Sequence, residues 1–189
     1  MSSFGEVMTD SLAERFPKLA ARMRRNAGSF LARCDPYQRE VKQIRSLVEH
    51  NDMASLEPYL LFEDKGEMDH RIFLQVTALA AFEDIGESSV PILERAFHGA
   101  SESQWRCCEG IIRAIAWMRG EAAGEFLLKA LAHPSYGVRY YAAYCIYKVG
   151  YAKALPELRA ELSRTQGNPQ LSSYAFALRW SIKGLESSL

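Results

Sequence analysis

Glycines recur along this chain at the spacing of a helical hairpin. Apolar runs with helical periodicity end at Gly86, Gly120, Gly150 and Gly184, at intervals of 34, 30 and 34 residues. Glycine readily takes the left-handed backbone conformation that closes many helices. A unit of this length cannot bury its own apolar face, so neighbouring units have to stack. The period therefore predicts an all-α chain built from repeated helix pairs.

The best-defined unit spans residues 133–158, and it combines a loop proline, a basic residue early in a helix, paired alanines and a closing glycine. In chain order its characteristic residues are Pro134, Val138, Arg139, Ala142, Ala143, Ile146, Gly150 and the segment ALPEL at 154–158. This pattern resembles the HEAT-like repeat, also called the phycobilin-lyase-type repeat. The resemblance covers residues 53–189 and implies a right-handed stack of antiparallel helix pairs with a curved inner face.

We therefore expect an α-solenoid of about four to five HEAT-like helical hairpins with an N-terminal helical cap. Residues 1–36 are expected to form this cap or a partly ordered segment, and residues 37–189 the repeat domain. Within the cap, residues 11–26 form a plausible amphipathic helix. The remaining helices are predicted at 38–50, 55–62, 69–84, 89–98, 103–118, 122–132, 137–149, 155–164 and 171–182.

The overall charge argues against two classes of partner. The chain has 23 basic and 23 acidic residues, so its formal net charge is zero, which disfavours general attraction to nucleic acid or anionic membrane. The first 16 residues contain three acids and no long apolar run, unlike a secretory signal. No stretch is long and apolar enough to cross a bilayer. We expect a soluble cytoplasmic protein whose partner is another protein.

The residue types that carry catalysis do not gather into a motif. The four cysteines show no metal or disulfide spacing, the four histidines fall near predicted helix ends, and no phosphate loop or nucleophile elbow is present. HEAT-like hydroxylases carry paired His-Glu dipeptides as iron ligands, and this sequence has none. We therefore expect a protein that is not an enzyme and holds no metal or cofactor. Two HEAT-like classes remain as alternatives, namely bilin lyases and proteins that act on nucleic acid.

Charge is distributed unevenly despite the zero total. Residues 1–48 carry nine bases and five acids, residues 49–102 three bases and twelve acids, and residues 103–189 eleven bases and six acids. Sequence order becomes spatial order in a solenoid, so the middle segment predicts an acidic band that includes Glu83, Asp84 and Glu87. Such a band could steer a basic partner. The alternative is that these acids only solvate outer helix faces.

Five tyrosines form a stripe on the helix predicted at 137–149 and the residues beside it. They are Tyr136, Tyr140, Tyr144, Tyr147 and Tyr151. Aligning the units on their closing glycines places Tyr147 level with Trp117 and Glu83, and Tyr140 level with Tyr174. Tyrosine and tryptophan are favoured interface anchors. The alternative is packing between repeats, and we expect Trp105 and Trp180 in the core. The predicted partner-binding residues are Glu83, Asp84, Glu87, Trp117, Tyr140, Tyr144, Tyr147 and Tyr174.

The resemblance and the surface pattern together predict a protein-binding scaffold. Its most concrete form is an immunity, inhibitor or adaptor protein that binds a cognate, basic bacterial toxin or effector through an acidic and aromatic concave face. A further alternative is a nucleic-acid binder that uses Arg22, Arg24 and Arg25 together with the basic C-terminal helices. The sequence carries no signal of oligomeric state.

Overall fold

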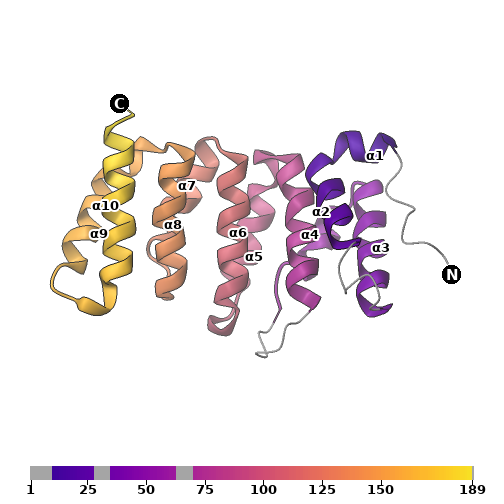
Figure 1. Ribbon diagram of the computed structural model, residues 1–189, viewed down its shortest axis with the longest axis horizontal. Coiled ribbons are helices and arrows are strands. Elements are labelled where there is room, and N and C mark those ends of the chain that lie inside the picture. The colour runs from indigo at the N-terminus through magenta and orange to yellow at the C-terminus, as the bar shows by residue number, and fades with distance from the viewer. Residues whose placement is uncertain (1–9, 28–34, 63–69, 189) are drawn as a thin grey trace. The chain divides into compact units, whose positions relative to one another are not determined.

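The computed structural model describes residues 10–27, 35–62 and 70–188 (Figure 1). Every regular element in these ranges is a helix, and none of them is a strand, so the predicted all-α class is confirmed. Contacts divide the chain into two compact units, Met1–Gly110 (unit 1) and Ile111–Leu189 (unit 2). The division falls inside helix α6, which spans Trp105–Met118. The predicted boundary after residue 36 stays a prediction.

Unit 1 is organised around helix α4. Helices α2 and α3 both pack against α4, and α5 packs against the short 3-10 helix η2. Its core includes Leu19 of α2, Ile44 of α3 and Phe82 of α4. The elements are α1 (Asp10–Arg15), α2 (Pro17–Ala27), α3 (Asp35–Glu49), η2 (Ala54–Tyr59), α4 (His70–Ile85), η3 (Glu87–Ser89), α5 (Val90–Gly99), η4 (Glu102–Gln104) and the first part of α6.

Unit 2 consists of two helix pairs and the last part of α6. Helix α7 packs against α8, α9 packs against α10, and α8 packs against α10. Buried apolar residues follow helical spacing on α8, where Val138, Ala142 and Ile146 are fully enclosed. After α6, the elements are α7 (Glu121–Ala130), α8 (Tyr136–Val149), η5 (Ala152–Ala154), α9 (Leu155–Thr165), η6 (Pro169–Leu171) and α10 (Ser172–Glu186).

Most of the predicted helices agree with the structure to within four residues at each end. The prediction for 55–62 was wrong, because this segment forms only the 3-10 helix η2. Pro58 lies inside it and has no N–H to donate to a helical hydrogen bond. The helix predicted at 11–26 is divided into α1 and α2, and Pro17 is the first residue of α2. Asp69, the predicted first residue of the next helix, lies outside the described residues.

Three of the four glycines that set the predicted period follow helices with a positive φ. Gly86, Gly120 and Gly150 have φ values of 82°, 91° and 74°. The prediction for Gly184 was wrong, because Gly184 lies inside α10, which continues to Glu186. A Cβ at this position would collide with the ring of Tyr147. Gly184 is therefore the point where α8 approaches α10 closely, and it does not end a helix.

Candidate binding site between helices α6 and α8

Two of the three predicted acidic contact residues hold helices together within unit 1. Asp84 lies at the end of α4, and its Oδ1 and Oδ2 accept hydrogen bonds from the backbone N–H groups of Lys18 (3.0 Å) and Leu19 (2.9 Å). These N–H groups lie in the first turn of α2, where a helix has no backbone acceptor of its own. Asp84 thus caps α2 and ties it to α4.

Glu83 is also engaged with α2. Its Oε2 lies 3.6 Å from the Nζ of Lys18 in an ion pair. Burial raises the pKa of the Glu83 carboxyl above its ordinary value, and the Lys18 ammonium limits this rise. Burial likewise raises the pKa of Asp84, against the effect of its two backbone donors. Glu87, the third of these residues, begins η3 and is exposed. Two of these three carboxylates, Glu83 and Asp84, therefore already have partners within unit 1.

The tyrosine stripe of α8 contributes mainly to packing between α8 and α10. The ring of Tyr144 is stacked on that of Trp180, with centroids 5.1 Å apart and planes at 6°. Tyr147 meets the same indole edge to face at 4.5 Å and lies against Gly184. Tyr147 and Tyr144 are both half-buried. Trp180 is 37% exposed, so it lies at the border of the core.

The remaining two predicted tyrosines differ in accessibility. Tyr174 is only 1% exposed. Its hydroxyl donates to Oε2 of Glu161 at 3.3 Å, and its backbone N–H donates to the hydroxyl of Tyr136 at 2.7 Å. Tyr174 is therefore part of the core of unit 2, which corrects its prediction as a partner-contacting residue. Tyr140 is half-buried and packs edge to face on Tyr141, with centroids 5.3 Å apart.

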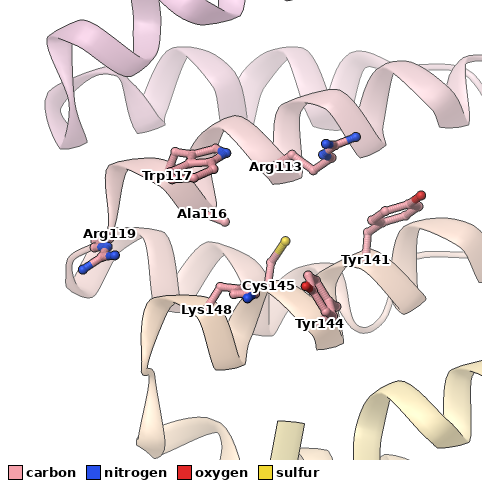
Figure 2. Close-up of a pocket in the computed structure, with 8 residues that line it drawn as sticks. All are labelled: Arg113, Ala116, Trp117, Arg119, Tyr141, Tyr144, Cys145 and Lys148. Atoms are coloured by element: carbon pink, nitrogen blue, oxygen red, sulfur yellow. The ribbon is translucent and has the colours of Figure 1, made fainter. Parts of the chain in front are cut away.

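Trp117 is the most exposed of the predicted aromatic residues. It lies in the last turn of α6 with 66% of its surface open to solvent. Its indole forms part of a pocket of about 570 Å³ between α6 and α8, called here the α6–α8 pocket (Figure 2). The lining residues all belong to unit 2, and they are Arg113, Ala116, Trp117, Arg119, Tyr141, Tyr144, Cys145 and Lys148.

The α6–α8 pocket combines positive charge with aromatic surface. Arg113 and Trp117 extend from α6, and Lys148 and Tyr144 come from α8 on the opposite wall (Figure 2). The Nζ of Lys148 lies 5.4 Å from the Tyr144 ring centroid, within the range of a cation–π contact. No acidic side chain is among the lining residues. The pocket therefore presents three cations and three aromatic rings.

Four of the five acids of unit 2 form ion pairs outside the pocket. Glu121 pairs with Lys153 (2.5 Å), Glu186 with Arg159 (2.6 Å), and Glu157 and Glu161 both pair with Arg164. These three bases lie in η5 and α9. In the part of the chain that the structure describes, the three pocket cations Arg113, Arg119 and Lys148 take part in no ion pair. Their positive charge is thus left to face solvent or a partner.

The thiol that lines the pocket is poorly suited to nucleophilic chemistry. This thiol, Cys145, is buried, and this burial raises the pKa of the thiol to about 12. A thiol with such a pKa stays protonated near neutral pH and is a weak nucleophile. Among the described residues, no group of three or more His, Cys, Asp or Glu side chains could hold a metal ion.

The structure separates the predicted site residues into two groups. Glu83, Asp84 and Glu87 belong to unit 1, whereas the predicted aromatic residues belong to unit 2. Sequence reasoning missed Arg113, Arg119 and Lys148, the cations of the pocket. One signal could have pointed to Lys148, because the sequence of α8 contains two bases and no acid.

Comparison with known proteins finds no family model, curated protein or solved structure that matches this chain. Among the described helices, none is both long and apolar enough to span a membrane.

Proposed function

We propose that this chain is a non-enzymatic binding scaffold of HEAT-like repeats, and that an anionic partner docks at the α6–α8 pocket. The observation that carries the proposal is the composition of this pocket. Its lining combines three cations that form no ion pair with any described residue and three aromatic rings, and it includes no carboxylate. Pockets that bind ligands commonly have volumes of about 300–1,000 Å³, and this one has about 570 Å³.

Local charge explains why the partner would be anionic although the whole chain is neutral. Unit 2 holds ten basic and five acidic residues. Four of the five acids are paired with bases of η5 and α9, so the excess positive charge falls on other helices. Charges that line a concave site reinforce one another and attract counter-charged groups. An anionic partner would gain this attraction without first breaking an ion pair.

The repeat architecture is part of the same proposal. It is supported by the pairing of α7 with α8 and of α9 with α10, and by the packing of α8 against α10. Gly150, which follows α8, has the left-handed conformation expected of a closing glycine. Successive helix pairs that pack in this way would present their second helices side by side, which is how α6 and α8 come to line one pocket.

An immunity or inhibitor protein that binds a basic toxin through the acidic segment draws less support from the geometry. Asp84 caps α2 and Glu83 pairs with Lys18, so neither carboxylate is available without loosening unit 1. Two of the aromatic residues that would accompany these acids, Trp117 and Tyr144, line a pocket with three cations. A basic partner on residues 49–102 stays a prediction, and a protein partner with an acidic surface fits the proposal.

The test is elution from immobilised heparin, a densely sulfated polyanion. One variant carries Arg113→Gln, Arg119→Gln and Lys148→Gln in the pocket. A matched control carries Lys153→Gln, Arg159→Gln and Arg164→Gln, which changes net charge equally but away from the pocket. We expect the pocket variant to elute at clearly lower salt than the control, because the control's bases are already paired with acids. Equal elution of the two variants would contradict the proposal.

A further inference from the structure

We propose that the anionic partner of the α6–α8 pocket is single-stranded nucleic acid, with one base stacked on Trp117 and the adjoining phosphates held by Arg113, Arg119 and Lys148. This inference rests on the proposed function and names the partner's chemical class. It follows from two features of the same pocket. Trp117 is largely exposed, and the three cations Arg113, Arg119 and Lys148 form no ion pair with any described residue. Proteins that bind single strands combine these same two features.

Trp117 provides the surface for a base. Two-thirds of the surface of Trp117 is exposed, which is unusual for a large apolar residue, and the residue forms part of the pocket wall. Tyr144 is held in place on the opposite wall by its stack on Trp180. A planar base that enters between these walls would cover apolar surface that is now in water. It would also gain stacking, which every nucleobase can provide because each has a π face.

The cations are placed to neutralise a phosphate chain. Arg113 and Arg119 lie on either side of Trp117 in the sequence, and Lys148 lies across the pocket on α8. Lys148 is already held over the rings of Tyr144 and Tyr147 by cation–π contacts at 5.4 and 5.7 Å. A phosphate bound beside a stacked base would therefore meet a cation on both walls. Arginine also suits phosphate because its planar fork can donate two hydrogen bonds at once.

The aromatic component favours a single strand over the other anionic partners. An acidic peptide would satisfy the cations, but its carboxylates bring no planar group to stack on Trp117. In a duplex the bases are already stacked and paired, so a base could enter the pocket only after leaving the stack. A single strand can present base and phosphate together at low cost.

The experiment measures dissociation constants of the full chain by fluorescence anisotropy with three labelled probes. The first is a thymidine oligonucleotide of about eight residues, within the usual site size of a single-strand groove. The second is an abasic oligomer with the same number of phosphates, and the third is an oligoglutamate of the same charge. Trp117→Ala is the test variant, and Phe176→Ala, which removes another exposed aromatic ring outside the pocket, is its control. Circular dichroism checks that both variants are folded.

We expect the thymidine oligomer to bind at least about tenfold more tightly than the abasic oligomer, the effect of one stacked base. Trp117→Ala should abolish this difference and leave abasic binding unchanged, whereas Phe176→Ala should preserve it. Equal binding of the two oligomers to the wild-type chain would overturn the inference, as would an equal effect of Trp117→Ala on both. Thymidine monophosphate that binds as tightly as the oligomer would also overturn it, in favour of a free nucleotide.

Failure of the inference can be distinguished from failure of the proposed function. If oligoglutamate binds as tightly as the thymidine oligomer, and Arg113→Gln with Lys148→Gln weakens both, the pocket recognises an acidic protein and the single-strand inference is overturned alone. If the pocket variant and its charge-matched control behave identically toward every probe, both are overturned.

Discussion

The rings of Tyr144 and Trp180 are stacked in parallel, with planes 6° apart and centroids separated by 5.1 Å. Tyr144 belongs to α8 and Trp180 to α10, so the stack joins two helices that also share a buried apolar seam. The same tyrosine lines the α6–α8 pocket. The packing of Tyr144 against Trp180 thus fixes the position of a residue that lines the candidate binding site.

The two tryptophans of unit 2 should therefore respond differently to truncation. Trp180→Ala removes the stack on Tyr144 and the edge contact with Tyr147, and we expect it to lower the free energy of unfolding by about 2 kcal/mol. Trp117→Ala removes a side chain that is mostly in solvent and should change stability by less than about 0.5 kcal/mol. Urea denaturation followed by circular dichroism measures both. A larger loss for Trp117→Ala would mean that its indole supports the fold.

Gly184 should tolerate no added methyl group, because the ring of Tyr147 occupies the space where its Cβ would lie. We expect Gly184→Ala to destabilise the chain by about 1–3 kcal/mol, the usual cost of overpacking. Gly99→Ala is the control, since no atom lies within 4 Å of a Cβ there. In a Tyr147→Ala background the cost of Gly184→Ala should largely disappear. A full cost in that background would contradict the assigned contact.

Asp84 should prove more important for stability than for binding. Asp84→Ala removes the acceptors for two N–H groups at the start of α2, and we expect a loss of about 2 kcal/mol. Glu102→Ala, which removes an exposed carboxylate in η4, should cost less than about 0.5 kcal/mol. Thermal and urea unfolding would measure this difference. Equal stabilities of the two variants would refute the capping role.

The thiol in the pocket wall should be chemically inert. Burial raises the pKa of Cys145 to about 12, so at pH 8 very little of it is thiolate in the folded chain. An unfolded cysteine has a pKa of about 8.5 and is partly ionised at that pH. We expect iodoacetamide to label Cys145 at least about 100-fold more slowly in the folded chain than in urea. Peptide mass spectrometry would measure both rates, and comparable rates would show that the thiol is accessible and ionisable.

Helix placement could be read from the sequence because apolar periodicity is local. The pattern that precedes Gly150 predicts both the helix and its closing glycine, and both are confirmed. The same pattern precedes Gly184, where the structure has a close helix contact. An apolar run followed by glycine cannot distinguish these cases, because the difference depends on Tyr147, which lies on another helix.

The candidate site was harder to predict because it depends on which charged side chains pair with one another in the folded chain. Counting residues gives an acidic middle segment, but it does not reveal that Asp84 accepts hydrogen bonds from backbone N–H groups at the start of α2. It also gives a basic C-terminal segment, without showing that four of its acids are paired away from the α6–α8 pocket. Trp117 and Tyr144 were identified as surface candidates, and both line the pocket. The neighbouring Arg113 and Lys148 come together only through the packing of unit 2.

The most direct test of the account is whether a bound polyanion covers the α6–α8 pocket. Lysines would be acetylated in the presence and absence of a heparin fragment, and the modified peptides would be quantified by mass spectrometry. Lys148, in the pocket wall, should lose most of its reactivity when the fragment is bound, whereas Lys42 of α3 and Lys153 of η5 should change little. Protection of Lys42 or Lys153 with Lys148 unchanged would contradict the central claim.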